Sequence, residues 1–526
     1  MREKVVKALK KAISEDIAIE VSVPDQGEFG HYSTNVAFKL ARVRRTSPIM
    51  VAEEIVLKVK TNKLFSRVAV ANPGFVNVWI SEKELAKELE IIIKEKNKYG
   101  TKKQTKTTKK KMQIEFVSAN PTGPLTLANG RGGFLGDAIA NVLLSQGHGV
   151  EREYYVNDTG NQVQTLGKSI VANCGFIPFE ENYYKGEYVK TWAELHTPFV
   201  EKNKNKFEIV GERAAGDFLK IIKEALEEKA GIHFNRYTSE KKDIHETGYV
   251  KKVLDMFSKL GKTYEADGAV WLKTTEHGDD KDRVLITSEK APTYFLADAG
   301  HYFETKKRGF TGKVLILGPD HYGYVARIQA AAEIIGLKES KVIITQAVRL
   351  VDKGGEVKMS KRKGQFVTFG ELMEEVGVDA ARFFFLMISP DSHMDFDIGL
   401  AKERSVKNPV FYVQYALVRA GSILGKTKKQ IAFNFSLLST KEDLTLVRKL
   451  IEFPDILEGV SGDLGIHHLT QYAIECSKAF HNFYEKERVD GVDKKTAGAR
   501  RALVEASYYV LGNTLRILGC GTPQKM

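Results

Sequence analysis

Residues 120–133 read Asn-Pro-Thr-Gly-Pro-Leu-Thr-Leu-Ala-Asn-Gly-Arg-Gly-Gly, a segment rich in glycine and proline. A strand-like run, Met112-Gln-Ile-Glu-Phe-Val117, precedes it, and a helical run over 134–144 follows it. A strand, a glycine-rich turn and a helix are the order in which an α/β fold presents backbone N–H groups to a phosphate. The order predicts a nucleotide-binding domain at this point of the chain.

The glycines and the polar side chains of this stretch suggest a triphosphate site. Gly130, Gly132 and Gly133 are expected to form a turn whose backbone comes close to phosphate groups. Thr126 and Asn129 can donate hydrogen bonds to the phosphate oxygens. A plain Gly/Pro turn is the alternative, and the flanking strand and helix count against it.

A second phosphate-binding candidate is the cationic segment Lys358-Met-Ser-Lys-Arg-Lys-Gly364. Lys358 and Lys361 can bring positive charge to a leaving pyrophosphate, and Met359 and Ser360 lie between them. In isolation, the tetrapeptide Lys358-Met-Ser-Lys361 would be interpreted as a solvated surface loop. Together with the first site it suggests an enzyme that binds ATP, accompanied by Mg²⁺, and transfers its adenylyl group. No dedicated metal cage is evident in the sequence.

Composition bounds the possible classes of protein. The chain has 526 residues, which is too many for one hydrophobic core, so several domains are expected. No apolar run reaches the roughly 20 residues of a membrane span, and no signal-peptide core follows the first residues. Three distant cysteines without metal-ligand spacing are typical of a cytoplasmic protein. The net charge of +13 favours a polyanionic partner, without distinguishing RNA from DNA.

Changes in pattern along the chain predict its organisation. We expect a small α/β domain over 1–95 that opens with a helix at 5–18, and a linker rich in lysine and threonine over 96–111. The linker is either a solvated tether or a lysine arm beside an RNA backbone. Residues 112–400 are predicted to form a doubly wound parallel sheet. Residues 401–526 are predicted to be entirely helical.

The predicted sheet is interrupted once. Residues from about 165 to 285 lack regular strand–helix alternation, and we interpret them as a mostly helical insertion. The β/α pattern is expected to resume at 284–287 and to include a strand over 341–350.

Several motifs resemble the arginyl-tRNA synthetase family of class I. Residues 120–131 match its first signature and 358–361 its second, the KMSK motif. Four further stretches resemble segments of this family, two of them at the join to its anticodon-binding domain: 27–37, 155–162, 380–393 and 408–416. The resemblance covers nearly the whole chain.

The resemblance implies an arginine–tRNA ligase, a monomer whose substrates are ATP, arginine and tRNA(Arg). It implies that the N-terminal domain binds tRNA and that the C-terminal helices bind the anticodon. It assigns Tyr294 and Asp298 to the guanidinium group of arginine and places Glu115 and Asn120 in the same pocket. A carboxylate beside a phenol suits the planar guanidinium fork. Gly318 and Asp320 are further candidates beside the nucleotide or the substrate amine.

The first signature departs from the family pattern. Its tetrad here is Thr126-Leu-Ala-Asn129, where the family usually has a histidine at both ends. Neither replacement can carry charge near neutral pH, so we hypothesise that charge stabilisation depends more on Lys358 and Lys361. One alternative is a catalytically weakened, synthetase-like tRNA-binding paralogue. Another is a small-molecule adenylyltransferase, which would not need the terminal domains.

Overall fold

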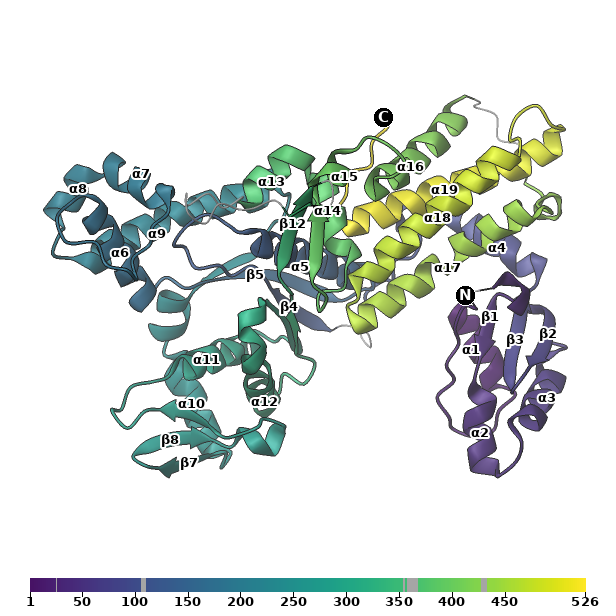
Figure 1. The fold of residues 1–526 in the computed structure, drawn as a ribbon. Coiled ribbons are helices and arrows are strands. Elements are labelled where there is room, and N and C mark those ends of the chain that lie inside the picture. Colours follow the sequence, from purple (N-terminus) through teal and green to yellow (C-terminus); the bar gives the residue numbers. More distant parts are fainter. Residues whose placement is uncertain (25, 106–109, 353–354, 357–367, 427–432) are drawn as a thin grey trace. The chain divides into compact units, whose positions relative to one another are not determined.

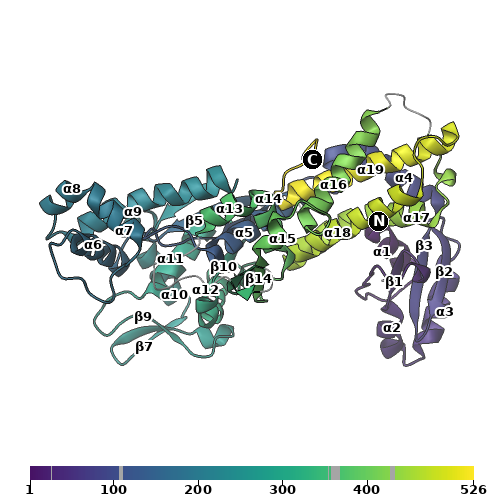
Figure 2. The ribbon, with the colours of Figure 1, turned by 45° about the horizontal axis from the view of Figure 1, so that its top comes forward.

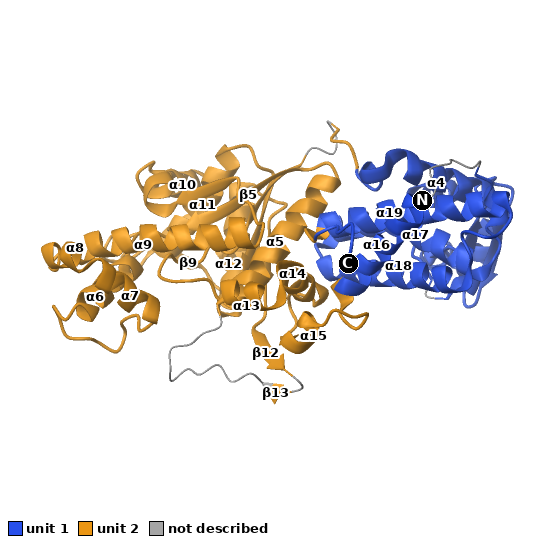
Figure 3. Ribbon diagram, turned by 90° about the horizontal axis from the view of Figure 1, so that it is seen from above, with its two compact units in different colours: residues 1–101, 411–517, 521–526 blue, residues 102–410, 518–520 orange. Residues whose placement is uncertain are grey.

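The computed structural model describes residues 1–24, 26–105, 110–352, 355–356, 368–426 and 433–526. They fall into two compact units (Figure 3). Unit 1 contains 1–101, 411–517 and 521–526, and unit 2 contains 102–410 and 518–520. The terminal regions of the chain therefore form one unit. The boundaries lie at 101 and 411, several residues after the predicted 95 and 400.

Unit 2 is built on the predicted parallel sheet. Its five strands have the order β11-β10-β4-β5-β6, and every neighbouring pair is parallel. Their bounds are β4 (Lys111–Glu115), β5 (Gly149–Val156), β6 (Arg236–Ser239), β10 (Gly312–Leu317) and β11 (Lys341–Ile344). The doubly wound fold class is confirmed.

The two faces of this sheet differ in character. Helix α5 (Leu127–Ser145) covers one face, towards which the apolar side chains of Phe116 and Ile316 point (Figure 1). Helix α11 (Tyr294–Lys307) covers the other face, where Gln113 and Glu115 meet its residues. Since side chains alternate along a strand, β4 sends apolar groups to α5 and polar groups to α11.

The glycine-rich segment is helical, so its prediction as a turn is wrong. Helix α5 begins at Leu127, and the glycines at 130, 132 and 133 lie inside it and are buried. Close packing explains two of the helix's glycines: a Cβ at Gly130 would lie 2.2 Å from the Phe369 ring, and one at Gly136 would lie 2.2 Å from the Phe116 ring. These glycines bring neighbouring elements close to the helix rather than backbone to a phosphate.

The prediction of a mostly helical insertion holds for its first part only. The helices α6 to α9 pack around Leu166, Trp192 and Phe218 and form a cluster at one end of unit 2 (Figure 2), and the π-helix η3 follows α9. Their bounds are α6 (Asn161–Asn173), α7 (Glu187–Leu195), α8 (Thr197–Lys202), α9 (Phe207–Lys223) and η3 (Glu224–Lys229). The chain then returns to the main sheet as β6. The helical segment therefore begins after β5 and ends before β6, two neighbouring strands of that sheet.

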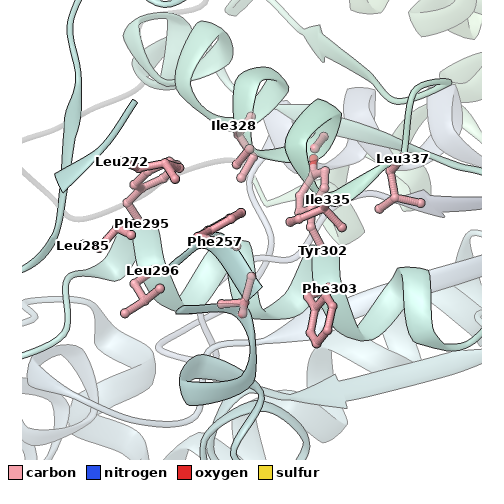
Figure 4. Packing of buried hydrophobic residues seen from close by; sticks show 14 of the residues in the cluster. Phe257, Leu272, Leu285, Phe295, Leu296, Tyr302, Phe303, Ile328, Ile335 and Leu337 are labelled. Atoms are coloured by element: carbon pink, nitrogen blue, oxygen red, sulfur yellow. The ribbon is translucent and has the colours of Figure 1, made fainter. Parts of the chain in front are cut away.

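A second excursion follows β6 and contains a small antiparallel sheet. It consists of η4 (Glu240–His245), α10 (Tyr249–Lys259), β7 (Thr263–Ala266), β8 (Ala269–Leu272), η5 (Thr274–His277) and β9 (Arg283–Ile286). The run predicted to resume the parallel pattern at 284–287 thus pairs antiparallel with β8 instead. A hydrophobic core that includes Phe257, Leu272 and Phe295 joins this region to α11 and α12 (Val325–Ile335) (Figure 4).

The strand predicted over 341–350 is two strands in different sheets. After β11 the chain enters a three-stranded sheet of order β13-β12-β14. The remaining elements of unit 2 are η6 (Pro319–Tyr324), β12 (Val348–Asp352), β13 (Gly355–Glu356), α13 (Phe369–Val376), α14 (Val378–Met387), β14 (Met394–Asp397) and α15 (Ile398–Lys402). The segment 358–361 lies outside the described residues.

Unit 1 combines the predicted small α/β fold with the predicted C-terminal helices. Its N-terminal elements are α1 (Arg2–Lys10), η1 (Gly27–Phe29), β1 (Tyr32–Thr34), α2 (Val36–Arg44), α3 (Pro48–Val59), β2 (Phe65–Ala71), β3 (Phe75–Ile80), α4 (Glu82–Glu95) and η2 (Lys96–Lys98). Its C-terminal elements are α16 (Pro409–Gly425), η8 (Phe435–Leu437), α17 (Lys441–Asp463), α18 (Ile466–Lys486) and α19 (Lys494–Leu518). The first helix ends at Lys10, not at 18.

Part of the predicted linker is packed rather than solvated. Tyr99 is 2% exposed, and its hydroxyl donates to Glu88 over 3.2 Å. The amide of Asn513 donates to the backbone oxygens of Lys96 and Tyr99. Residues 96–101 therefore belong to unit 1, in which 99 and 100 are buried, whereas 96–98 and the described residues 101–105 are exposed.

Candidate active site

The altered tetrad forms the N-terminal cap of α5. The Thr126 hydroxyl oxygen accepts the Asn129 backbone N–H at 3.4 Å, and the Asn129 carbonyl Oδ1 accepts the Thr126 backbone N–H at 2.9 Å. This reciprocal capping box satisfies donors that a helix start leaves free. Both residues thus have a structural role that the sequence interpretation did not assign.

The cap determines which tetrad group remains for a ligand. The Thr126 hydroxyl also donates to Asn129 Oδ1 over 2.8 Å, so that oxygen receives two hydrogen bonds. The Thr126 backbone donor fixes the amide orientation, which leaves the Asn129 Nδ2 group without a partner among the described residues. An amide NH₂ at the positive end of a 19-residue helix is suited to an anionic oxygen.

An acidic cluster surrounds Asp298, in the second turn of α11. Burial raises the pKa of its carboxyl to about 6, the Tyr324 hydroxyl lowers it by donating a hydrogen bond, and Glu240 and Glu115 raise it further. Burial likewise raises the pKa of Glu240. Two neighbouring carboxyl groups with raised pKa values, those of Asp298 and Glu240, indicate a site suited to a cation.

Tyr294 and Asp298 lie on α11 as predicted, with Thr293 as the helix cap. Their environments differ, since the Tyr294 side chain is 72% exposed whereas Asp298 is half-buried. Tyr294 therefore lies at the surface one turn before the buried carboxylate. The structure does not record a contact between the two side chains.

The loop after β4 carries Glu115 and Asn120. Two non-glycine residues in this loop, Val117 and Ser118, have positive φ values of 67° and 39°. Such backbone is sparsely populated and is held here by Ser118, whose hydroxyl donates to Glu115 over 3.2 Å and accepts the Tyr155 N–H over 3.1 Å. Glu115 is buried beside this loop, and Asn120 is half-buried in it.

A buried ionic layer lies between the sheet and α11. Lys313 on β10 is fully buried, and its Nζ lies 2.7 Å from Glu115 and 3.3 Å from Glu153. His301 on α11 lies 3.0 Å from Glu153 and stacks on Tyr155. Burial alone would lower the pKa of Lys313, but the two carboxylates together raise it above its ordinary value. Burial opposes the charge of Glu153, but His301 and Lys313 lower its pKa well below the usual range.

This layer contains a group of side chains with the spacing of metal ligands, although the Lys313 ammonium already contacts both of its carboxylates. Among the described residues, oxygen or nitrogen atoms of Glu115, Glu153 and His301 lie within 4.8 Å of one another. The Lys313 ammonium contacts both carboxylates, which pairs their charge. A Mg²⁺ ion that accompanies ATP fits the triphosphate oxygens better than this group.

Gly318 and Asp320 lie at the C-terminal edge of the sheet. Gly318 follows β10 and precedes η6, and open space surrounds the position of a Cβ on it. Asp320 is exposed in η6. This edge is where open α/β sheets bind ligands.

Sequence reasoning missed several polar residues of the site. Glu240 and Tyr324 border Asp298, and Glu153, His301 and Lys313 form the ionic layer. One available signal was Lys313, which directly precedes the apolar run Val314-Leu-Ile-Leu317 in the predicted strand. A charged side chain in a central strand needs a buried partner of opposite charge.

In unit 1, aromatic and basic side chains gather on α16 and α18. The His481 ring lies 4.6 Å from the Tyr412 ring and 5.7 Å from the Tyr415 ring, and the Arg419 guanidinium lies over Tyr415 and Tyr484. Tyr484 is 38% exposed. Aromatic rings beside arginine suit unstacked RNA bases.

Comparison with known proteins gives consistent matches along the chain. Residues 1–80 match the arginyl tRNA synthetase N terminal domain, 88–384 the class I (R) tRNA synthetase catalytic domain, and 413–526 the DALR anticodon binding domain. The arginine–tRNA ligase of Carboxydothermus hydrogenoformans is 37% identical over 546 residues, covering 100% of this chain and 97% of that protein. The Listeria monocytogenes enzyme of the same name is 38% identical, covering 99% and 98%.

Solved structures show the same fold. The Thermus thermophilus arginyl-tRNA synthetase has a TM-score of 0.81 at 20% identity and covers 100% of both chains. The Plasmodium falciparum arginyl-tRNA synthetase has a TM-score of 0.78 at 16% identity, covering 100% of this chain and 99% of that one. The catalytic-domain match spans more than half of the chain, and the sequence relatives span all of it. The chain therefore belongs to the arginyl-tRNA synthetase family.

Proposed function

We propose that this chain is an active arginine–tRNA ligase in which the acidic cluster around Asp298 binds arginine and the capped end of α5 meets ATP. In the first step a carboxylate oxygen of arginine attacks the α-phosphorus, and pyrophosphate leaves. In the second step a hydroxyl of the terminal ribose of tRNA(Arg) attacks the arginyl carbonyl, and AMP leaves. Positioning and electrostatics carry both steps.

The observation that carries the proposal is the cluster of carboxylates around Asp298. Glu240 and Glu115 both lie near enough to Asp298 to raise its pKa, and burial raises the pKa of Asp298 and of Glu240. A guanidinium supplies the charge that this cluster needs and can bond to carboxylates through two N–H groups. Tyr294 and Asn120 are the proposed polar neighbours of the substrate.

On the ATP side, the proposal assigns Asn129 Nδ2 to a phosphate oxygen and Thr126 to holding that amide. Gly130, whose missing Cβ makes room for the Phe369 ring, and Gly132 are proposed to lie beside the nucleotide at the helix start, and Gly318 and Asp320 to border it. Lys358, Met359, Ser360 and Lys361 lie outside the described residues, and the family resemblance supports their assignment to the pyrophosphate. Mg²⁺ on the triphosphate, a monomeric state and a cytoplasmic location complete the proposal on family grounds. Among the described residues, no helix combines the length and apolarity that crossing a bilayer requires.

Exchange of labelled pyrophosphate into ATP tests the proposal. The exchange should depend on arginine, with tRNA(Arg) added because the family often needs it in the first step. Asp298→Asn should raise the arginine KM without a comparable change in the ATP KM. An absence of exchange beside an active control enzyme would support the tRNA-binding paralogue instead.

A further inference from the structure

We propose that Lys313 is a positioning residue for arginine recognition: its buried ammonium holds Glu115 in the orientation that the substrate pocket requires. The inference rests on the proposed function, because it concerns the same pocket. Lys313 does not touch the substrate in this assignment and acts through Glu115.

Both oxygens of Glu115 are held by the protein. Lys313 Nζ lies 2.7 Å from Oε2, and the Ser118 hydroxyl donates to Oε1 over 3.2 Å. The carboxylate is therefore fixed by one charged and one neutral donor. The charged contact is the stronger of the two, since charge-assisted hydrogen bonds are about twice as strong as neutral ones.

Glu153 competes for the same ammonium. It lies opposite Glu115 in the register of β4 and β5, and Lys313 bridges the two carboxylates. Glu153 has further donors in Thr238 and His301, whereas Glu115 is 3.8 Å from the nearer His301 nitrogen. Without Lys313, Glu115 would face a second buried carboxylate and keep only Ser118 as a close donor. Oxygen atoms of the two carboxylates lie within 4.8 Å of each other, and like charges that close share a proton or move apart.

The positions of the other charges support a role in orientation. Arg236 lies 3.9 Å from Glu153 and 3.3 Å from Glu304, and Arg308 pairs with Glu151 and Glu304. These two arginines form their salt bridges with acidic residues other than Glu115. Among the described residues, two basic side chains lie within salt-bridge distance of Glu115: Lys313 at 2.7 Å and His301 at 3.8 Å. Lys313 is the closer of the two.

The substitution Lys313→Met distinguishes orientation from simple charge. If Lys313 only repelled the guanidinium, its removal would lower the arginine KM. If it positions Glu115, its removal raises the arginine KM, by at least about tenfold, because breaking a buried pair leaves an uncompensated charge. We expect the tenfold increase, with kcat and the ATP KM changed less than about threefold. The matched control is Lys307→Met, an exposed lysine on α11, which should leave all three values unchanged.

A charge-balanced comparison keeps the test valid if Lys313→Met does not fold. In the Glu153→Gln variant, Glu115 is the carboxylate that still pairs with Lys313. The arginine KM of this variant should therefore rise less than that of Lys313→Met. Adding Lys313→Met to Glu153→Gln should raise the KM again. An arginine KM in the double variant equal to that of Glu153→Gln would overturn the inference, as would an unchanged or lower KM in Lys313→Met. A wild-type chain without arginine-dependent exchange would instead overturn the proposed function.

Discussion

Asn129 has two separable functions in this chain, because its amide group carries one acceptor and one donor. The acceptor Oδ1 caps α5 by receiving the Thr126 backbone and hydroxyl donors. The donor Nδ2 is free to meet a phosphate in the proposed ATP site. A histidine-free tetrad can thus keep both helix order and an anion-binding group at the same position.

Asn129→Asp separates these two functions. The variant keeps an acceptor oxygen at the third helical position of the capping box, where a carboxylate is favourable, but it replaces the amide donor with a negative charge. We expect the ATP KM to rise at least about tenfold while the thermal unfolding midpoint of the protein changes little. Thr126→Ser, which preserves the capping hydroxyl, is the matched control. A wild-type ATP KM in Asn129→Asp would exclude a phosphate contact by this residue.

Asp298 should make arginine binding depend on pH in the mildly acidic range. Its pKa is raised to about 6, so the carboxyl takes up a proton below that pH and loses its attraction for guanidinium. Calorimetric binding of arginine between pH 5 and 8 should weaken by up to about tenfold per pH unit below 6. Asp298→Asn should bind weakly throughout, and the two curves should converge at low pH. A flat wild-type curve would contradict the raised pKa.

The same pKa shift has a defined sign for stability. A carboxyl whose folded pKa exceeds its unfolded value favours the folded state most below the unfolded pKa, here 3.8. That contribution is lost as the pH rises through about 6. In the absence of arginine, the Asp298 charge therefore opposes folding at neutral pH, and bound arginine should offset this cost.

At the scale of elements, α5 illustrates what the sequence could and could not predict. Local pattern located the strand before it and its apolar run, but it did not identify Thr126 and Asn129 as the helix cap. The glycines at 130–133 have strong turn propensity, which favoured a turn over a helix start. Gly130 is a glycine because a Cβ there would lie 2.2 Å from the ring of Phe369, a residue over 230 positions away, and no local pattern reveals that proximity.

Other misassignments of elements share this cause. The run 341–350 is divided between two sheets because β12 pairs with β14, which comes later in the chain. Likewise β6, β7, β8 and β9 are four residues each, too short for alternation to distinguish them from loops. The ionic layer escaped notice because its members come from three strands and a helix. The family motifs, by contrast, are contiguous and were sufficient for the fold class and the family.

A matched pair of glycines in α5 tests the packing argument. A Cβ at Gly136 would lie 2.2 Å from the Phe116 ring, whereas one at Gly132 would lie 3.6 Å from Ile316, an ordinary contact. Gly136→Ala should destabilise unit 2 by about 1–3 kcal/mol through overpacking. Gly132→Ala should be neutral or stabilise by up to about 1 kcal/mol, because alanine is the better helix former. Urea unfolding followed by circular dichroism measures both, and equal effects would refute the assignment.

The N-terminal residues 1–101 and the C-terminal residues 411–517 fold as one unit. Tyr32 of β1 is 1% exposed and donates to Asp455 of α17 over 2.7 Å, and Asp455 also accepts the Arg2 backbone N–H. Burial and Asp455 raise the pKa of the Tyr32 hydroxyl, which keeps it protonated as a donor. Unit 1 thus joins the predicted tRNA-binding and anticodon-binding regions through buried polar contacts.

Tyr32→Phe should weaken both segments of unit 1 together. The variant removes one donor from a buried carboxylate without leaving a large cavity, so we expect a loss of about 1–3 kcal/mol in unit 1. Hydrogen exchange read by mass spectrometry should show reduced protection in 1–101 and 411–517 alike, with unit 2 unaffected. Tyr264→Phe, on the exposed β7 of unit 2, is the control. Loss of protection confined to 1–101 would mean that the two segments are stable independently, and that the joint unit arises from contact without cooperative folding.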